Sequence, residues 1–244
     1  MRLNKVVIGI RFNKKSFKLS SLSGIVVDDV LELRETNRKL GPNYLSQFKS
    51  SLEHHNLYLK FMDADNFHTL TITPERFLFT KKSPNDTASV NIDTVIEEFE
   101  ILWKTVSKTL KFPDIRMIGI VGEYHIGLKK DEIAGDKLTK SLLKFDGINQ
   151  TKHFNLQFEN REMDNKGLFP DGDTSDFWNT IYSYYPSEID VDYPTENKIN
   201  ANIDVQKYYN PAKSDPVREL RLLKSKFSKK KEEFKAMNHK LGIE

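Results

Sequence analysis

The chain has 244 residues, with 38 Lys and Arg against 35 Asp and Glu, a formal charge of +3, and 38% hydrophobic positions. A chain of this length buries roughly 70% of the surface that its unfolded form exposes, so it needs no disulfide or metal to fold. The absence of Cys excludes disulfides, thiolate zinc sites, iron–sulfur clusters and Cys nucleophiles. The apolar run from Val6 to Ile10 is short, and no window reaches the roughly 18 apolar residues of a membrane-spanning helix. We therefore expect a soluble cytoplasmic protein.

The first half of the chain predicts a strand, a helix, three strands and a second helix. In order these are a strand at Val6–Ile10, a helix from Val26 to about Lys39, strands at Leu57–Met62, His68–Thr73 and Arg76–Thr80, and a helix from about Ile92 to Lys111. The last helix is the clearest, because its apolar residues recur at i, i+3, i+4 and i+7 spacing and Phe112-Pro113 ends it.

The second half repeats this order. It predicts a strand at Met117–Ile126, a helix at Asp136–Phe145, strands at His153–Phe158, Phe177–Tyr185 and Ile199–Val205, and a long helix from about Val217 to Leu241. We therefore expect an α+β fold in which an extended antiparallel sheet is backed by helices on one face. The two similar units would be lobes at 1–112 and 113–244, or parts of one continuous domain.

Charge is unevenly distributed over the last hundred residues. Residues 151–200 contain four Lys and Arg against ten Asp and Glu, whereas residues 201–244 contain eleven against six. The acidic stretch 159–176 is mainly polar and indicates a surface loop.

The final helix carries an apolar stripe and a basic face. The stripe consists of Leu220, Leu223, Phe227, Phe234, Met237 and Leu241, with Lys230 in a position where an apolar residue is expected. The basic residues, our candidate binding site, are Arg218, Arg221, Lys224, Lys226, Lys229, Lys230, Lys231 and Lys235. Three interpretations stay open: a solvated charged face, a nucleic-acid contact, or a surface for an acidic protein or a second copy of the chain.

Catalytic motifs are weak. Asp171, Asp173 and Asp176 are potential ligands for magnesium or calcium, but they lack the spacing of a calcium-binding loop. Glu196 and Lys198 match one half of a magnesium-dependent nuclease motif. Glu123 and His125 lie on one strand face and are a candidate acid–base pair. Because each pattern is common in a chain rich in these residues, we expect no catalytic site, metal or cofactor.

The layout resembles a sporadically distributed bacterial and archaeal family of unknown function. The matching segments are Val7-Ile-Gly-Ile-Arg11-Phe12, Leu70-Thr-Ile-Thr-Pro74-Glu75-Arg-Phe77, Phe99 to Trp103, Asn202-Ile203-Asp204-Val205, and the helical segment Leu220 to Phe234. The Arg-Tyr-Ile-Asn stretch of that family is replaced by Val121-Gly-Glu-Tyr124-His-Ile126. The resemblance implies no activity, although sporadic distribution is typical of genes that travel with mobile elements and defence systems.

These observations predict a non-enzymatic interaction protein, an accessory subunit or antitoxin-like partner in a bacterial or phage conflict system. Its partner would be a protein, or a second copy bound through the final helix, and we expect no membrane contact. The first alternative is a nucleic-acid-binding protein that uses the basic final helix. The second is a metal-dependent nuclease or hydrolase.

Overall fold

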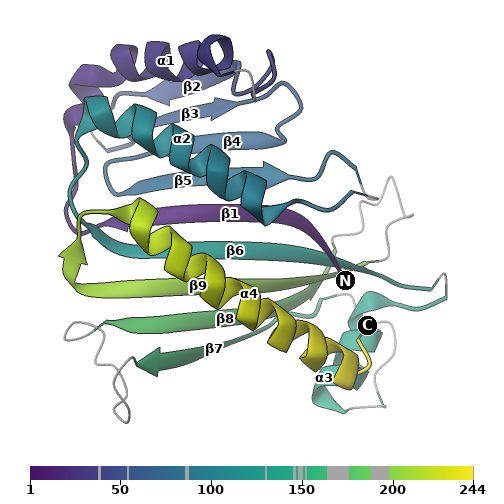
Figure 1. Cartoon of the computed structure of the whole chain (residues 1–244). Coiled ribbons are helices and arrows are strands. Elements are labelled where there is room, and N and C mark those ends of the chain that lie inside the picture. The colour runs from purple at the N-terminus through teal and green to yellow at the C-terminus, as the bar shows by residue number, and fades with distance from the viewer. Residues whose placement is uncertain are drawn as a thin grey trace.

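A computed structural model of the chain shows an α+β fold built on one nine-stranded antiparallel sheet. The structure describes residues 1–37, 40–53, 55–85, 88–129, 131–144, 147, 151, 153–163, 176–187 and 198–243. In chain order the elements are β1 (Arg2–Phe12), α1 (Lys18–Thr36), β2 (Gln47–Ser51), β3 (Tyr58–Met62), β4 (His68–Ile72), β5 (Arg76–Lys82), α2 (Ile92–Leu110), β6 (Ile115–Gly127), α3 (Ala134–Leu143), β7 (Leu156–Met163), β8 (Phe177–Pro186), β9 (Lys198–Lys213) and α4 (Pro216–Lys240). The strand order is β2-β3-β4-β5-β1-β6-β9-β8-β7, so the first strand of each half lies at the centre (Figure 1).

The α+β class, the extended antiparallel sheet and the long C-terminal helix are confirmed. The first half has one more strand than predicted, because β2 follows α1 at the edge of the sheet. Four of its five residues are exposed, so an edge strand of this kind leaves no alternating apolar pattern in the sequence. The division of the chain into two lobes at residues 112 and 113 stays a prediction. The ladder between β1 and β6 pairs a strand of the first predicted lobe with a strand of the second.

Several boundaries also differ from the sequence prediction. Helix α1 begins at Lys18 rather than Val26. Residues 159–163, predicted as a loop, form the second half of the edge strand β7, where cross-strand pairing with β8 outweighs their polar character. Strand β9 continues to Lys213, well beyond the predicted end at Val205.

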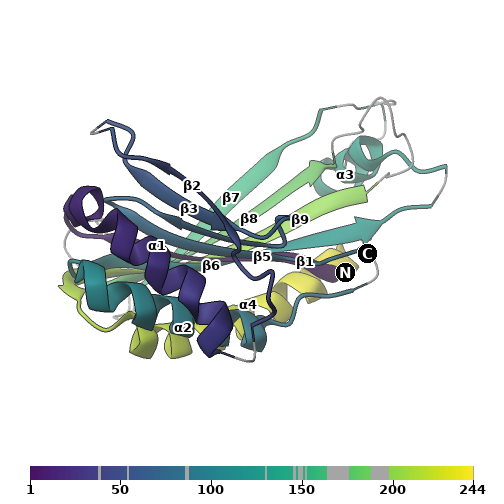
Figure 2. The same cartoon turned by 90° about the horizontal axis from the view of Figure 1, so that it is seen from above.

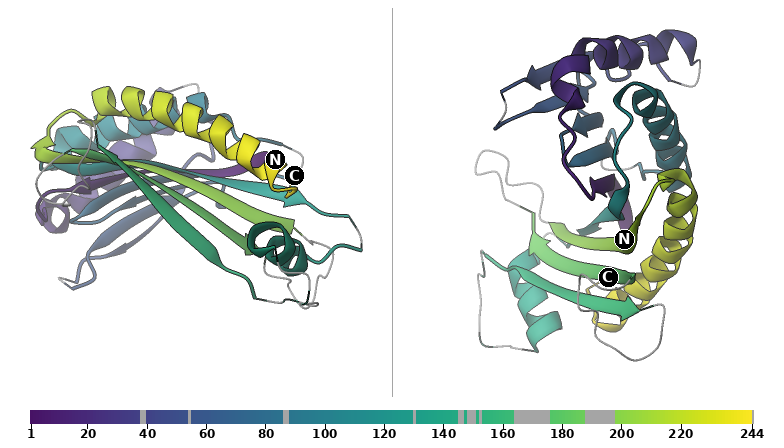
Figure 3. Two further views of the ribbon diagram at one scale, coloured as in Figure 1. Left: turned by 90° about the horizontal axis from the view of Figure 1, so that it is seen from below. Right: turned by 90° about the vertical axis from the view of Figure 1, so that its left-hand side faces the viewer.

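Three helices cover one face of the sheet. Helices α1, α2 and α4 lie side by side on this face, and the sheet curves away from them (Figures 1 and 2). The apolar side chains of the strands meet the helices here, among them Ile8, Phe79 and Ile120, which are fully buried. Helix α3 differs from the prediction of helices on one face only, since it lies across the sheet from α4 at one end (Figure 3). None of the helices that the structure describes is long and apolar enough to span a membrane.

Local sequence explains where the helices α2 and α4 begin. The side chain of Asn91 accepts hydrogen bonds from the backbone amides of Asp93 and Thr94 and so caps α2. Asp215 caps α4 in the same way, and Pro216 occupies the first turn, where its missing N–H costs nothing.

The lysine that interrupts the apolar stripe of α4 is accommodated by an ion-pair network. The Lys230 side chain is 10% exposed, and its Nζ lies 2.6 Å from Glu162 Oε1 and 3.0 Å from Glu233 Oε2. Lys226 Nζ lies 2.5 Å from the other oxygen of Glu162. Burial opposes ionisation of Glu162, but the hydrogen bonds from Lys226 and Lys230 outweigh it and hold the pKa of this carboxyl below its ordinary value. Glu162 therefore fastens the edge strand β7 to α4.

We expect Glu162→Ala to lower the free energy of unfolding by about 1–3 kcal/mol, because it leaves the largely buried Lys230 with one partner. Glu233→Ala is the control and should cost less than about 1 kcal/mol, since Glu233 is more exposed. Because the folded pKa of Glu162 is lowered, its contribution is present above about pH 4 and is lost as the pH falls further. Urea unfolding at pH 7 and pH 3.5 measures both effects, and equal losses for the two variants at pH 7 would contradict this role.

Candidate functional site

The face of the sheet turned away from α1, α2 and α4, called the open face below, carries the polar residues of the strands. On β1, the core side chains Val6, Ile8 and Ile10 alternate with Val7, Gly9 and Arg11. Successive side chains on a strand point to opposite faces, and residues directly opposite each other on neighbouring strands share a face. The register of the ladders therefore assigns every strand position to the core face or to the open face.

Positive charge dominates the open face. Its described strand positions include nine Lys and Arg, namely Arg2, Lys5, Arg11, Lys49, Lys60, Arg76, Lys82, Arg161 and Lys198. They include three acids, Glu123, Glu159 and Asp204. All three acids lie on β6, β9 and β7, so the part of the face formed by β1 to β5 has cations and no carboxylate among these positions.

Six of these cations stand directly opposite one another across strands. The pairs are Lys5 with Lys82, Arg11 with Arg76, and Lys49 with Lys60. Lys5 is compensated by Glu123, whose Oε2 lies 3.2 Å from its Nζ. The other five form no ion pair within 4 Å with residues that the structure describes, although the charges of Arg11 and Arg76 act on Glu75 and help to lower the pKa of its carboxyl. Like charges directly opposite each other destabilise a sheet, so the fold carries a cost here that packing does not explain.

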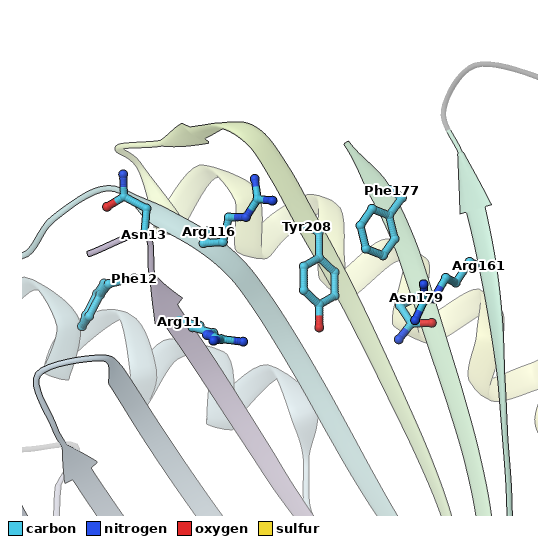
Figure 4. Close-up of a pocket in the computed structure, with 8 residues that line it drawn as sticks. All are labelled: Arg11, Phe12, Asn13, Arg116, Arg161, Phe177, Asn179 and Tyr208. Atoms are coloured by element: carbon cyan, nitrogen blue, oxygen red, sulfur yellow. The ribbon is translucent and has the colours of Figure 1, made fainter. Parts of the chain in front are cut away.

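A cavity of about 430 Å³ lies at the end of the open face where β1 ends and β6 and β8 begin. It is lined by Arg11, Phe12, Asn13, Arg116, Arg161, Phe177, Asn179 and Tyr208 (Figure 4). Three strands far apart in the sequence, β1, β6 and β7, each contribute one arginine. No carboxylate is among the described residues that line it.

Two of the three guanidinium groups are held in place by other residues. Arg116 Nη1 donates to the backbone carbonyl of Tyr209 at 2.5 Å. Arg161 Nη2 lies 2.7 Å from Glu159 Oε1, and its guanidinium carbon lies 5.8 Å from the centre of the Phe177 ring. Arg11 is exposed and makes no hydrogen bond or ion pair within the described part of the chain. The cavity is therefore lined by two guanidinium groups, of Arg116 and Arg161, that are held by neighbouring residues, and by the exposed guanidinium group of Arg11.

Tyr208 lies between the arginines that line the cavity. Its ring stacks on Phe177 with a centroid distance of 4.5 Å and an interplanar angle of 4°. Its hydroxyl donates to Gln206 Oε1 at 3.0 Å. Burial raises the pKa of Tyr208, with Asp204 adding to the rise, and the charges of Arg11 and Arg161 oppose it. The two arginines therefore act electrostatically on the same hydroxyl group, although they come from β1 and β7.

Asp204 is a buried carboxylate beside the cavity. Gln206 Nε2 donates to its Oδ2 at 2.6 Å, whereas its Oδ1 is inaccessible to solvent and has no hydrogen-bond partner among the residues that the structure describes. Burial raises the pKa of Asp204 to about 6, although the hydrogen bond from Gln206 opposes the rise. Asp204 thus orients Gln206, whose Oε1 in turn accepts a hydrogen bond from the Tyr208 hydroxyl.

The structure places the candidate residues of the final helix on the other side of the sheet. Arg218, Arg221, Lys229 and Lys235 are exposed on α4. The remaining four have acidic neighbours: Lys224 with Asp93, Lys226 and Lys230 with Glu162, and Lys231 with Glu232. The apolar stripe of α4 packs on its own sheet, with Leu220, Leu223 and Phe234 fully buried. Half of the predicted binding residues therefore already have partners within the chain.

Most of the candidates for a metal or nuclease site lie outside the part of the chain that the structure describes. Asp171, Asp173 and Glu196 lie outside the described residues. Asp176 accepts a hydrogen bond from the Asn210 amide at 2.6 Å, and Lys198 begins β9. The described residues contain no group of three or more side chains suited to hold a metal ion.

Glu123 and His125 are neighbours on the open face, as predicted, with 3.7 Å between Glu123 Oε1 and His125 Nε2. Lys5 also contacts Glu123, and the Asn4 amide nitrogen lies 3.3 Å from His125 Nε2. The hydrogen bond to His125 and the charge of Lys5 outweigh burial and lower the pKa of Glu123. A lowered pKa makes Glu123 a poor general base, so this pair is better suited to an ion-pair network.

A second polar cluster is buried on the core side, between α2 and the strands. His68 Nδ1 lies 2.6 Å from Asp63 Oδ2 and its Nε2 lies 3.6 Å from Glu98 Oε2. Lys81 donates to Glu98 at 2.7 Å. Asp63 also accepts the Leu45 amide at 2.8 Å, so it joins the segment before β2 to the turn after β3. The cluster therefore has a structural role.

Sequence reasoning missed the arginine cavity, because its arginines are separated by about a hundred and by about forty-five residues in the chain. Three residues in or beside the site did stand in segments quoted for the family resemblance, namely Arg11, Phe12 and Asp204. Alternation places Arg11 and Asp204 opposite the core within their own strands. That alternation was the available signal, but it does not say which strands are neighbours.

We expect Asp204→Asn to stabilise the protein at neutral pH. The folded pKa of Asp204 is raised to about 6, so its ionised form costs stability that is absent below about pH 4 and grows as the pH rises through 6. The variant should gain about 1–3 kcal/mol at pH 7.5 and nothing at pH 4. Urea unfolding at both pH values measures the gain, with the exposed Asp131→Asn as the control; a gain that is the same at both pH values would contradict burial of this charge.

Comparison with known proteins adds no homologue. No family model matches the chain, and no curated protein sequence is similar to it. The resemblance to a prokaryotic family of unknown function therefore stays an expectation, and the function is inferred from the geometry of the open face.

Proposed function

We propose that this is a cytoplasmic, non-enzymatic protein that binds nucleic acid across the open face of its sheet. The observation that carries the proposal is the three cation pairs, Lys5 with Lys82, Arg11 with Arg76, and Lys49 with Lys60. A polyanion laid across the sheet neutralises these pairs and releases its own counterions, which is the main source of affinity for a phosphate backbone. The repulsion in the free protein is thereby removed on binding.

The open face supports this role better than the basic face of α4. On α4 the cations alternate with Glu219, Glu232 and Glu233, and four of the eight basic residues contact acids. On the strands β1 to β5 the open face has no described carboxylate to repel a phosphate. Nucleic-acid binding, the first alternative predicted from the sequence, is therefore proposed for the open face of the sheet instead of the basic face of α4.

Aromatic side chains lie among these cations. Tyr58 lies on β3, while Tyr185 and Tyr208 lie on β8 and β9 at open-face positions. All three are partly exposed. Stacking of bases on aromatic rings contributes about 1–3 kcal/mol per base and tolerates any sequence. A basic sheet with interspersed tyrosines favours single-stranded nucleic acid bound without strict sequence preference.

The double variant Lys49→Gln/Lys60→Gln tests the surface. We expect it to weaken binding of a 20-nucleotide single strand by about 10-fold and to reduce the salt slope by about 1.4, because two phosphate contacts are lost. It should also raise the free energy of unfolding by about 0.2–1 kcal/mol, since it removes a like-charge pair. Fluorescence anisotropy from 50 to 200 mM salt and urea unfolding provide the two measurements.

The matched control is Arg221→Gln/Lys229→Gln, which removes the same charge from exposed positions of α4. It should leave affinity within about twofold. If the α4 variant loses affinity and the sheet variant does not, the site is the final helix. If the wild-type protein binds neither single-stranded nor double-stranded nucleic acid at 50 mM salt, the proposed function is wrong.

A protein partner, as in an accessory subunit of a conflict system, is the second candidate. The observation that favours it is the edge strand β2, where Phe48 is 48% exposed, and the adjacent Leu52, which is 51% exposed. An edge strand offers unpaired backbone groups to a strand of another chain. This surface lies at the opposite end of the sheet from the arginine cavity.

For this second candidate we expect a complex that survives 0.5 M salt and nuclease treatment, because backbone pairing and apolar contact are only weakly screened. Pull-down from a host lysate measures it, together with light scattering of the purified chain for self-association. Phe48→Glu should abolish the complex, whereas Phe158→Glu at the other edge, 40% exposed, should not. Loss with both variants, or with neither, would contradict an interface at β2.

A further inference from the structure

We infer that a second cavity, called the aromatic cavity below, binds a nucleobase, and, resting on the proposed function, that this is an unpaired base of the bound strand. The cavity lies at the end of the sheet where β4 ends and β3 and β5 begin. Its volume of about 560 Å³ falls in the range of small-molecule sites, about 300–1,000 Å³. Two strands and three connecting segments line it, with Lys15, Phe17, Asn56, Tyr58, Thr71 and Glu75 among the lining residues.

Aromatic side chains suit this cavity to a flat ring. Phe17 is 43% exposed, and Tyr58 is partly exposed at an open-face position of β3. Leu57 and Pro74 add apolar surface to the lining. Aromatic side chains of proteins stack on any nucleobase, because every base has a π-face. The cavity therefore offers a base two rings and an apolar surround.

Asn56 and Thr71 supply hydrogen-bonding groups to the same cavity. Neither side chain makes a hydrogen bond within the part of the chain that the structure describes. An amide presents donors and an acceptor together, and a hydroxyl group does so on one atom. The edge of a base carries donors and acceptors side by side. These two residues can therefore bind a base that stacks on the rings.

The charges that line the cavity are compensated. Lys15 Nζ lies 2.6 Å from Glu75 Oε1. His55, the other titratable residue of the lining apart from Tyr58, has its Nε2 3.2 Å from Glu53 Oε2. A phosphate would find no excess of positive charge here, so the cavity suits the base of a nucleotide rather than its phosphate.

Cation pairs of the open face flank the aromatic cavity on two sides. Tyr58 lies two positions before Lys60 on the same face of β3, and Lys60 lies opposite Lys49. Arg76 directly follows the segment between β4 and β5 that lines the cavity, and it lies opposite Arg11. Phosphates on the two sides of an inserted base can thus each meet one cation pair. This placement favours a base that belongs to a strand.

The backbone that carries Phe17 is fixed to the sheet. The chain leaves β1 at this end to begin α1 (Figure 1). On the way, the Phe12 amide donates to the Glu75 carbonyl and the Ser16 amide to the Pro74 carbonyl, both at 2.9 Å. Phe17 therefore stands beside the segment between β4 and β5 before a ligand arrives, and such preorganisation reduces the entropic cost of binding.

The test compares a fluorescent 20-nucleotide strand with an abasic strand of the same length and charge. We expect Phe17→Ala to weaken binding of the strand with bases by about 10-fold, because the stacking of one base is lost. It should leave binding of the abasic strand within about twofold and the salt slope of both unchanged, since no phosphate contact is removed. Asn56→Ala, at an exposed position, should show the same pattern with a smaller loss. Circular dichroism and urea unfolding confirm that each variant is folded.

Phe158→Ala is the matched control, since Phe158 is 40% exposed and does not line the cavity. It should change the affinity for neither strand. Adenosine, which has a base and no phosphate, is tested alone by saturation-transfer NMR. We expect it to bind the wild-type protein and the Phe158→Ala variant, and to lose this binding in the Phe17→Ala variant.

The outcomes separate this inference from the proposed function. An equal loss for both strands in the Phe17→Ala variant, or a loss for neither, overturns the base site and leaves nucleic-acid binding intact. Binding of adenosine that depends on Phe17, with no binding of any strand, keeps a base site for a small ligand and overturns the nucleic-acid source. If the wild-type protein binds neither strand nor adenosine, both are overturned.

Discussion

The pairing of β1 with β6 is the constraint on which the rest of the molecule depends. These strands begin the two halves of the chain, and their antiparallel ladder runs from Arg2 opposite His125 to Phe12 opposite Ile115. Each strand then pairs on its other side, β1 with β5 and β6 with β9. The ladder thereby joins the five strands β1 to β5 and the four strands β6 to β9 into one sheet, and it sets the register between these two groups.

One close approach shows how tightly this centre is packed. Gly122 on β6 lies opposite Val6, and a Cβ atom added at Gly122 would come within 2.8 Å of the Phe227 ring on α4. Only a residue without a side chain lets α4 rest on the sheet at this point. The long C-terminal helix thus closes the core over the same ladder that joins the halves.

The two faces of this sheet serve different purposes. Aliphatic and aromatic residues gather under α1, α2 and α4, where the buried clusters of Phe77, Phe99 and Trp103 pack edge to face. The open face contains repelling cations, the partnerless oxygen of Asp204 and the arginine cavity. Features that cost stability are typical of functional surfaces, and here they lie together on the side that the core does not use.

Local periodicity along the chain predicts most of the helices and strands and the alternation within them. The apolar repeat of residues 92–110 and the short strands of residues 58–82 follow from local periodicity, because helices and strands impose periods of 3.6 and 2 on buried positions. The edge strand β2 and the second half of β7 were not predicted, because strands that bury few side chains show little apolar alternation in the sequence. Arg11 and Asp204 were visible as polar residues inside apolar strands.

Which residues meet depends on the strand order and register of the folded sheet. Arg11, Arg116 and Arg161 form one cavity because β1, β6, β9, β8 and β7 are consecutive in the sheet, and this order depends on long-range pairing. The structure also gave the basic residues of α4 acidic partners on α2 and β7, which no spacing along the helix reveals. Periodicity is a local property of the chain, whereas strand order and register arise from packing the whole chain at once; for that reason the fold class was predictable and the site was not.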